Sequence, residues 1–173
     1  MRSDVEHRTE AVVDDLTGLL NRRALDQRLE ELRALAAVGD QSIAAIAADI
    51  DHFKRVNDEH GHARGDAVLA QVAQRLRGRL RAFDLAYRVG GEEFLVLLPG
   101  ASADEAAALA EGLRDAIGSD PIAGLSITVS FGVAATGGGA FDGEGLLADA
   151  DRALYAAKAA GRDRVATVYA LTA

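Results

Sequence analysis

Short apolar runs alternate along the chain with stretches in which apolar residues recur every three or four positions. Apolar runs of four to eight residues predict buried strands, and the three-to-four spacing predicts amphipathic helices. Residues 51–59 suit a polar turn or a short helix, and the run at 42–50 is open to either a strand or a helix. The predicted strands are residues 42–50, 85–89, 94–98, 125–135 and 165–169, and the predicted helices are residues 22–38, 65–80, 102–117 and 145–160.

The alternation of strands and helices, with one hairpin near its centre, predicts an α/β chain of the α+β sandwich type. In such a fold a central mixed sheet, here of about five strands, is flanked by helices. Residues 14–173 are expected to form one domain. Residues 1–13 are charged and carry Val5 and Val12 one heptad apart, which is typical either of the end of a coiled coil or of a frayed terminal helix.

The hairpin lies in the stretch YRVGGEEFLVLLP, residues 87–99. Gly90 and Gly91 suit a two-residue turn, and the apolar run after them predicts a covered strand that stops at Pro99. Glu92 and Glu93 are therefore expected at the mouth of a rigid hairpin. A carboxylate held in such a place is costly unless a cation compensates its charge.

Two further carboxylates are expected near this hairpin. Asp49 ends the first apolar strand and Asp51 follows two residues later, so both can point to the same side. If that strand neighbours the hairpin, Asp49 lies beside Glu92 and Glu93. Oxygen ligands of this kind suit Mg²⁺ or Mn²⁺, and such a site serves phosphoryl or nucleotidyl transfer. The alternative is that these acids cap the strand ends in solvent.

Composition narrows the classes of function. The chain has 173 residues, 49% of them hydrophobic, with no cysteine and a formal net charge of −8. The lack of cysteine excludes disulfides and thiolate metal sites and favours a cytoplasmic location. The acidic balance argues against a nucleic-acid polymer as partner. No apolar run reaches roughly 18 residues and no signal-peptide core begins the sequence, so neither membrane insertion nor secretion is expected.

Five blocks carry a specific resemblance through their order and spacing: DDLTGLLNRR, DIDHFKRVNDEHGHARGD, YRVGGEEF, TVSFGVA and ADRALYAAKAAGRDRV. On these blocks nearly the whole chain resembles the GGDEF family of diguanylate cyclases, with a GGEEF variant at residues 90–94. The resemblance implies a fold like that of nucleotidyl cyclases and polymerase palms, with the active site on the hairpin. It also implies condensation of two GTP into cyclic di-GMP with release of two pyrophosphates.

The resemblance implies a divalent metal site at the hairpin. Asp49 would bind the ion through its carboxylate and Ile50 through its backbone carbonyl, and Glu92 and Glu93 would complete the site. Glu92 is also the candidate general base for the ribose 3′-hydroxyl. A metal ion alone can lower the pKa of that hydroxyl, which leaves the identity of the base open.

The resemblance implies the substrate contacts as well. Asn57 and Asp66 would recognise guanine, because a carboxylate accepts from the N1 and N2 donors that adenine lacks. His62 falls among the nucleotide-contacting positions. The phosphates would be bound by the backbone amides of His52 and Phe53 and by the side chains of Lys54, Lys158 and Arg162.

Each of these positions has a simpler interpretation. Asn57 and Asp66 stand near predicted helix boundaries and could be helix caps. Lys158 and Arg162 are four residues apart near a helix C-terminus, where the helix dipole favours cations. His62 follows a glycine and could be an ordinary turn residue.

Arg81 and Asp84 form an Arg-x-x-Asp pair upstream of the hairpin, and in the family such a pair is the core of an inhibitory site for the product. Arginine binds the acceptor edge of guanine and aspartate its donors, so the pair suits a cyclic dinucleotide. The alternative is a basic helix end followed by a strand start. Gly112 replaces an arginine that some members add to this site. Asp163 replaces the usual asparagine and brings a negative charge near the phosphate-binding cations.

The resemblance also implies how the domain works with partners. Each domain would bind one GTP, so catalysis requires a homodimer, and a sensor or regulatory domain is expected N-terminal to it in a longer protein. One alternative is a non-catalytic module that binds cyclic di-GMP through Arg81 and Asp84. Another is a cyclase of other nucleotides, which the predicted guanine contact of Asp66 disfavours.

Overall fold

The computed structural model describes residues 11–36, 41–137 and 140–169. The helix expected at residues 1–13 falls mostly outside these ranges. Of its described part, Val13 forms an isolated antiparallel bridge with Leu20, so the segment that leads into the domain is extended at that point.

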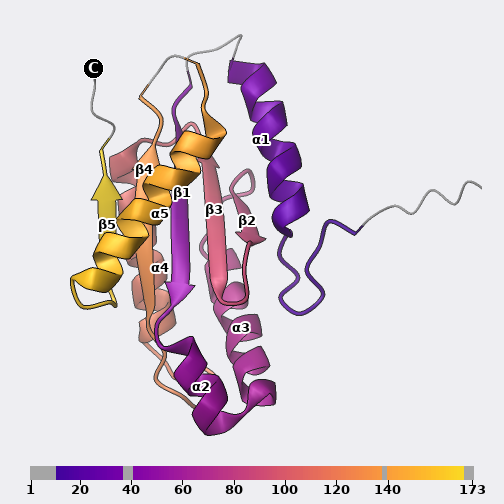
Figure 1. Cartoon of the computed structure of the whole chain (residues 1–173), viewed down its shortest axis with the longest axis vertical. Helices are drawn as coiled ribbons and strands as arrows, with labels where there is room; N and C mark the ends of the chain where they lie inside the picture. The colour runs from indigo at the N-terminus through magenta and orange to yellow at the C-terminus, as the bar shows by residue number, and fades with distance from the viewer. Residues whose placement is uncertain (1–10, 37–40, 138–139, 170–173) are drawn as a thin grey trace, which may run out of the picture.

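Within the described residues, five strands form one mixed sheet in the order β2-β3-β1-β4-β5, as Figure 1 shows. The central strand β1 is antiparallel to both β3 and β4, β2 is antiparallel to β3, and β5 is parallel to β4. This topology confirms the predicted mixed sheet. The strands are β1 (Ile43–Ile50), β2 (Leu85–Arg88), β3 (Glu93–Pro99), β4 (Val129–Ala135) and β5 (Val165–Val168).

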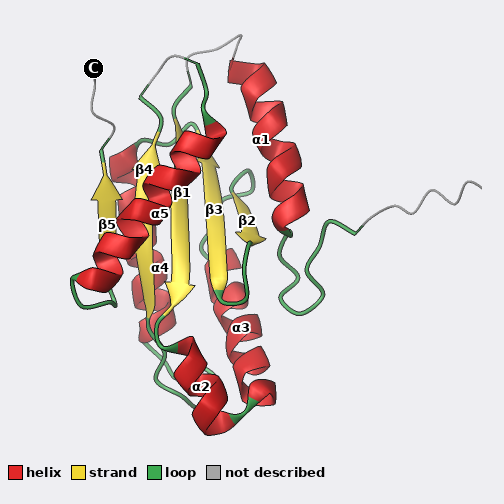
Figure 2. Ribbon diagram, viewed as in Figure 1, coloured by secondary structure: helices red, strands yellow, loops and turns green. Residues whose placement is uncertain are grey.

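Helices cover both faces of the sheet (Figure 2). The helices α1 and α5 lie on one face, α3 and α4 lie on the opposite face, and α2 follows β1 at the lower end of the sheet. The sandwich is therefore the predicted one. The helices are α1 (Arg22–Ala36), α2 (Phe53–His60), α3 (His62–Arg77), α4 (Ala103–Gly118) and α5 (Gly143–Ala159).

Most element boundaries lie within two residues of the predictions, and two elements differ by three or more. The helix predicted at 65–80 runs from His62 to Arg77, because Gly61, with φ 83°, separates it from α2 and lets it start earlier. The strand predicted at 125–135 begins only at Val129. Leu125 instead exchanges backbone hydrogen bonds of 2.8 and 2.9 Å with Ile122 in a tight turn.

Small residues in β1 and β4 let helices pack closely on both faces. The strand β1 is buried along its whole length. Its even-numbered residues from Ala44 to Ile50 join the core under α3 and α4, and Ile43, Ala45 and Ala47 join the core under α1 and α5. At Gly132 of β4 a Cβ atom would collide with the α5 backbone at Ala150 and Leu154. This glycine therefore sets how closely α5 approaches the sheet.

The segment before α1 is fastened to the edge of the sheet. Leu20 lies beside β2, where it accepts from the Arg88 amide at 2.8 Å and donates to the Ala86 carbonyl at 3.2 Å. Asp14 accepts hydrogen bonds from the amide and hydroxyl of Thr17 at 2.9 and 2.6 Å, and it pairs with Arg88 at 3.2 Å. Arg88 also donates to the Gly91 carbonyl at 2.8 Å. The DDLTGLLNRR block is therefore linked directly to the hairpin turn.

Candidate active site

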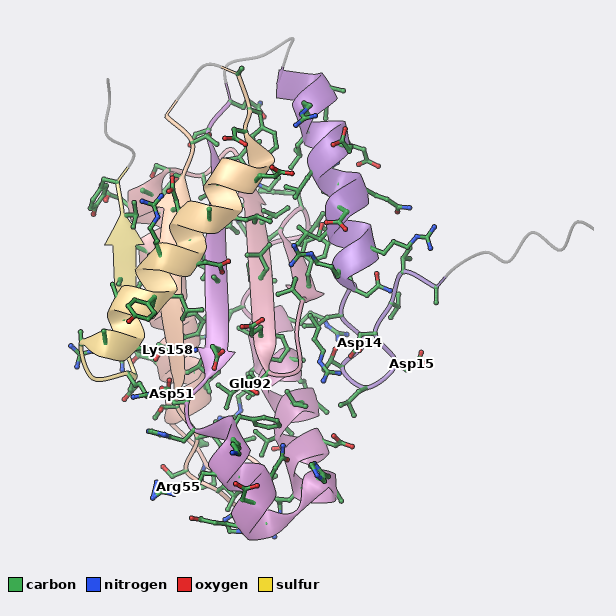
Figure 3. All side chains as sticks on the ribbon, in the orientation of Figure 1. Asp14, Asp15, Asp51, Arg55, Glu92 and Lys158 are labelled. Atoms are coloured by element: carbon green, nitrogen blue, oxygen red, sulfur yellow. The ribbon has the colours of Figure 1, made fainter. Side chains whose placement is uncertain are left out.

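The sheet register brings the predicted acidic residues together. Asp49 of β1 pairs with Glu93 of β3, and the Ile50 amide donates to the Glu92 carbonyl at 3.3 Å. Figure 3 shows Glu92, Lys158 and Asp51 near the lower end of the sheet, where β1 ends and the hairpin turns. The expectation that Asp49 lies beside both glutamates is confirmed.

The hairpin turn is wider than predicted. Four residues, Val89–Glu92, separate the two strands where a two-residue turn was expected. The amides of Val89 and Gly90 both approach the Glu93 carbonyl, at 2.9 and 3.4 Å, which closes a broader loop. The Glu93 carboxylate folds back over Gly90, where a Cβ would leave it too little room. Gly90 therefore serves side-chain placement in addition to the turn.

Burial and like charge act on the carboxylates of this site. Asp49 is buried, with 8% of its side chain exposed, and its Oδ2 lies 2.9 Å from Nζ of Lys158. Burial raises the pKa of Asp49, although Lys158 opposes the shift. Burial also raises the pKa of Glu92, and the negative charges of Asp49 and Glu93 raise it further against the pull of Lys158. One lysine therefore compensates this cluster only in part.

The carboxylate cluster is chemically suited to a divalent cation. Within the described residues, no three His, Cys, Asp or Glu side chains stand close enough to form a ready-made metal site. The donors at this end of the sheet are all oxygens, and the raised pKa values of Asp49 and Glu92 reflect burial and repulsion that a bound cation would offset. The Ile50 side chain is buried in the core, so Ile50 could contribute its backbone only. This donor set fits Mg²⁺ or Mn²⁺ once the glutamate side chains close around the ion.

Backbone amides are available where α2 begins. His52 precedes the helix with φ 56°, and within the described part of the chain its side chain makes no capping hydrogen bond. The amides at a helix N-terminus point outward and favour an anion. Phe53 starts the helix with its ring buried, and Lys54 is exposed in the same turn. The arrangement agrees with phosphate contacts from the His52 and Phe53 amides and from Lys54.

Asn57 and Asp66 are not helix caps, which corrects that alternative. Both lie inside helices, because the N-terminal caps of α2 and α3 are His52 and Gly61. Asn57 Oδ1 is buried with no hydrogen-bond partner among the described residues, and it fills the space that a Cβ on Gly65 would need.

The surroundings of Asn57 are those of a binding site. A buried acceptor without a donor is rare in proteins and calls for a missing partner. Asp66, which directly follows Gly65, is exposed. His62, the first residue of α3, is exposed as well. An acceptor and a carboxylate on adjacent helices suit the donors of a guanine base. Sequence reasoning had missed that Gly65 makes room for Asn57.

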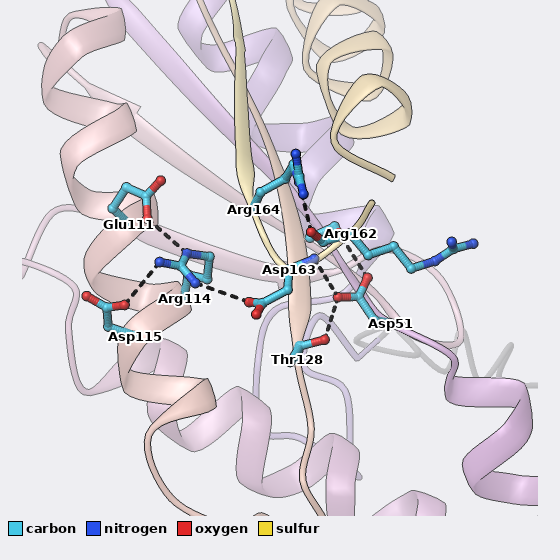
Figure 4. A network of polar contacts seen from close by, with 9 residues as sticks. Asp51, Glu111, Arg114, Asp115, Thr128, Arg162, Asp163 and Arg164 are labelled. Carbon is cyan, nitrogen blue, oxygen red and sulfur yellow. Dashed lines mark hydrogen bonds and ion pairs between the residues drawn. The ribbon is translucent and has the colours of Figure 1, made fainter. Parts of the chain in front are cut away.

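Two of the three predicted phosphate-binding cations, Lys158 and Arg162, lie at or just after the end of α5. The charges of Lys158 and Arg162 both act on Asp49 and lower its pKa against the effect of burial. Asp163 was expected to bring a negative charge near these cations. Its carboxylate accepts from Arg114 of α4 at 3.2 Å (Figure 4), and Arg114 also pairs with Glu111 and Asp115, so the expectation stays a prediction.

Asp51 has a structural environment quite unlike that of Asp49. It is buried, with 6% of its surface exposed, and its carboxylate accepts hydrogen bonds from Thr128 at 2.7 Å, Ser130 at 2.6 Å and the Asp163 amide at 3.0 Å. The interpretation of Asp51 as a solvent-exposed cap is therefore wrong. Nothing in the sequence pointed to its link with Asp163, because the two residues are 112 positions apart.

Arg81 and Asp84 occupy the turn between α3 and β2. Asp84 Oδ2 accepts from the backbone amide of Arg81 at 2.9 Å and from its Nε at 3.2 Å, and the Asp84 side chain is fully buried. The Arg81 side chain is 54% exposed and stacks over Phe83, 4.8 Å from the ring centre. The local geometry matches the simpler alternative, in which Asp84 is bound by the turn that starts a strand.

The same turn also borders a pocket of about 350 Å³. Residues from the segment before α1, the end of α3 and the start of β2 line it, and the lining residues among those described include none from α4. Gly112 lies on α4, so it is not among the residues that line this pocket. The lining residues are Gly18, Leu19, Leu20, Arg77, Leu80, Arg81, Ala82, Asp84, Leu85 and Ala86.

Comparison with known proteins confirms the resemblance. A family model described as "Diguanylate cyclase, GGDEF domain" matches residues 11–164. The chain is 41% identical over 172 residues to the response regulator PleD of Caulobacter vibrioides, covering 95% of this chain and 38% of that protein. It is 48% identical over 166 residues to the diguanylate cyclase DgcP of Pseudomonas aeruginosa, covering 92% of this chain and 24% of that protein. The chain thus spans well under half the length of these relatives.

Solved structures share the fold. The GGDEF domain of DgcB from Caulobacter crescentus, in complex with c-di-GMP, has a TM-score of 0.86 at 36% identity, covering 92% of this chain and 97% of that one. The active GGEEF domain of a diguanylate cyclase from Vibrio cholerae has a TM-score of 0.70 at 33% identity, covering 83% of this chain and 89% of that one. Among the described residues, no helix is both long and apolar enough to cross a membrane.

Proposed function

We propose an activity for this chain, which belongs to the GGDEF family of diguanylate cyclase domains. It condenses two GTP into cyclic di-GMP and releases two pyrophosphates. The observation that carries the proposal is the register that places Asp49 opposite Glu93 and beside Glu92, with carboxylate charges that Lys158 compensates only in part. Such a cluster is costly to the fold and is explained by a divalent cation that binds there with the substrate.

The proposed residue roles come from the family resemblance, and the geometry of the site supports them. Asp49, the Ile50 carbonyl, Glu92 and Glu93 would hold Mg²⁺ or Mn²⁺, which would neutralise phosphate charge and make the ribose 3′-hydroxyl easier to deprotonate. Glu92 is the candidate general base that accepts the proton of the ribose 3′-hydroxyl.

The bound nucleotide is positioned by residues from both ends of the site. Asn57, His62 and Asp66 contact the guanosine. The amides of His52 and Phe53 and the side chains of Lys54, Lys158 and Arg162 bind the phosphates.

Each domain binds one GTP, so the reaction needs a second copy of the chain. The 3′-oxygen of one GTP attacks the α-phosphorus of the other, the bond from that phosphorus to the bridging oxygen breaks, and pyrophosphate leaves. The reciprocal attack then closes the ring. Since the relatives are much longer than this chain, we expect an accompanying regulatory domain to control the pairing. The cytoplasmic location and a domain boundary at residues 13 and 14 stay predictions.

A regulatory role for Arg81 and Asp84 forms part of the proposal. The pocket beside them and the exposed guanidinium of Arg81 support binding of cyclic di-GMP as an inhibitor. Because Asp84 is enclosed and already bonded to Arg81, cyclic di-GMP would contact the exposed side chain of Arg81 before that of Asp84. The same observations favour a second candidate function, a module that binds cyclic di-GMP without making it.

One assay separates the two functions. The chain, at concentrations up to those that favour dimers, is incubated with GTP and Mg²⁺, and the products are separated by chromatography against cyclic di-GMP and pyrophosphate standards. We expect both products from GTP, and none from ATP or from the Glu92→Gln variant. Binding of cyclic di-GMP without any synthesis from GTP would identify the non-catalytic module and refute the cyclase.

A further inference from the structure

The turn that carries Arg162 has an unusual backbone. Arg162 and Asp163 have φ of 62° and 44°, both in the left-handed region, although neither is a glycine. Two such residues in succession are strained and persist only when their surroundings hold them. The local bonds are those from the Arg162 amide to the Ala157 carbonyl and from Arg164 Nε to the Arg162 carbonyl, both 3.0 Å.

Asp51 supplies a bond to this turn from the other side of the site. Its Oδ2 accepts from the Asp163 amide at 3.0 Å, and hydroxyl donors from Thr128 and Ser130 fix the carboxylate in place. All three partners donate to Asp51, and the backbone N–H of Asp163 can act only as a donor. A carboxylate meets all of them, whereas the side chain of asparagine would present its NH₂ group to some of them.

Arg114 anchors the same turn from the opposite face of the sheet. Its guanidinium lies 3.2 Å from Asp163 Oδ1, and Glu111 and Asp115 hold it in place at 2.9 and 3.3 Å. Figure 4 shows the turn at Asp163 between Asp51 on one side and Arg114 on the other. The turn is thereby attached both to the end of β1 and to α4.

We propose that Asp51 is a positioning residue, which together with Arg114 holds the strained turn so that Arg162 is directed at the nucleotide phosphates. The inference rests on the proposed function, because it uses the assignment of Arg162 to the phosphates. We assign Asp51 to neither metal nor nucleotide, because its carboxylate oxygens already accept hydrogen bonds from Thr128, Ser130 and the Asp163 amide. Its neighbour in the DID sequence, Asp49, carries the chemistry.

The test compares affinities for 3′-deoxy-GTP and 3′-deoxy-GMP, which lack the attacking hydroxyl and so bind without reacting. Arg162→Ala removes the phosphate contact and should weaken the triphosphate by about ten- to a hundredfold, with the monophosphate nearly unchanged. Asp51→Asn leaves Arg162 in place but loosens the turn, so it should weaken the triphosphate by roughly three- to tenfold. The double variant should match Arg162→Ala, because a residue that acts through Arg162 has nothing left to position.

Additive losses in the double variant, or an equal loss for both nucleotides, would show that Asp51 supports the fold only and would overturn the proposal. An Arg162→Ala variant with full triphosphate affinity would overturn it too, because there would be no phosphate contact to position. The measurement needs no turnover, so it distinguishes these outcomes even if the cyclase assay fails.

Arg114→Ala provides a second test at a partly exposed site, where the fold is less at risk. It should reproduce the selective loss for the triphosphate in weaker form, about two- to threefold. Arg33→Ala is the matched control, since Arg33 pairs with Glu30 on the exposed surface of α1, 3.7 Å away. An Arg114→Ala variant that behaves like Arg33→Ala would show that Arg114 does not help to hold the turn at Asp163.

Discussion

Two aspartates mark strand ends of the same sheet, Asp49 at the end of β1 and Asp84 before β2, and both are buried. Asp84 accepts the backbone amide and the guanidinium of Arg81, the residue three positions before it, and its side chain is enclosed. Asp49 pairs with Lys158 at 2.9 Å, and Arg162 also lowers its pKa, but the carboxylates of Glu92, Glu93 and Asp51 lie around it. One site is satisfied by its own turn, and the other gathers like charges from distant segments.

The difference separates a carboxylate that serves the fold from one that serves a reaction. Burial of a charge is tolerated where hydrogen bonds and an opposite charge replace the lost water, as at Asp84. At Asp49 the compensation is incomplete, so the fold gains little from the charge there. The same substitution at the two positions should therefore have opposite consequences.

Asp49→Asn should have the largest effect, and on turnover alone. A neutral amide cannot hold a divalent ion as a carboxylate does, and loss of its several kcal/mol of charge stabilisation should cut cyclic di-GMP synthesis about a thousandfold or more. The melting temperature should stay level or rise, because a charge costly to bury is removed. Chromatographic assay of product and thermal unfolding of the same samples measure both quantities.

Glu92→Gln serves as a second variant at the same site and should show the same separation of activity from stability. Synthesis near the normal rate by either variant would contradict the metal-site assignment. A melting temperature that falls as far as in Asp84→Asn would mean that Asp49 is a structural residue after all.

Asp84→Asn should act on the fold. The amide group would turn donors toward the donors of Arg81, and an unpaired buried group costs about 1–3 kcal/mol, or roughly 2 to 10 °C in melting temperature for a domain of this size. Thermal unfolding checks the loss, and Asp49→Asn is its matched control. An unchanged melting temperature would show that the turn before β2 does not depend on this carboxylate.

The fold was predictable from the sequence because its signals are local. Apolar runs such as 42–50 and the helical spacing at 65–80 are read from neighbouring residues, and the errors are small shifts at element ends. The turn at 89–92 was misjudged because the amides of Val89 and Gly90 both approach the Glu93 carbonyl, which a two-residue Gly-Gly turn does not predict.

The site was only partly predictable, and the reason is distance along the chain. The carboxylates of Asp49, Glu92 and Glu93 were expected together because strand pairing places them so. Lys158 was assigned to the phosphates through the family resemblance, and its ion pair with Asp49 was not predicted. The Asp51 network was missed, since its contact with Asp163 joins segments that no periodicity connects. The assigned roles of these residues stay predictions until tested.

Arg81→Ala extends the comparison to the partner of Asp84. The side chain of Arg81 is 54% exposed but that of Asp84 is enclosed, so loss of the ion pair should cost about 1–3 kcal/mol of stability. Binding of cyclic di-GMP should weaken about tenfold through the lost guanidinium contact. Calorimetric titration measures the affinity, and the initial rate before product accumulates is the internal reference for inhibition. If the unaltered chain gives no heat with high micromolar cyclic di-GMP, then Arg81 and Asp84 form a structural turn and do not bind this ligand.

The smallest expected effect is a difference in the direction of pH dependence. Burial raises the pKa of Asp49 above its ordinary value of 3.8, whereas at Asp14 burial is outweighed by hydrogen bonds from Thr17 and the charge of Arg88, which lower the pKa. A group with a raised pKa adds stability below its unfolded pKa, and loses that stability as the pH rises through its folded pKa. A group with a lowered pKa adds stability above its unfolded pKa and loses it as the pH falls.

Unfolding free energies of the unaltered chain, Asp49→Asn and Asp14→Asn are therefore compared from about pH 3 to about pH 7 without divalent ions. The advantage of the unaltered chain over Asp49→Asn should shrink as the pH rises above roughly 4, the ordinary range of an aspartate. The unfolding free energy of the unaltered chain relative to Asp14→Asn should instead grow as the pH rises to roughly 4. Parallel curves for the two variants would mean that Asp49 is as well compensated as Asp14. The contrast between a reactive and a structural carboxylate would then fail at its electrostatic basis.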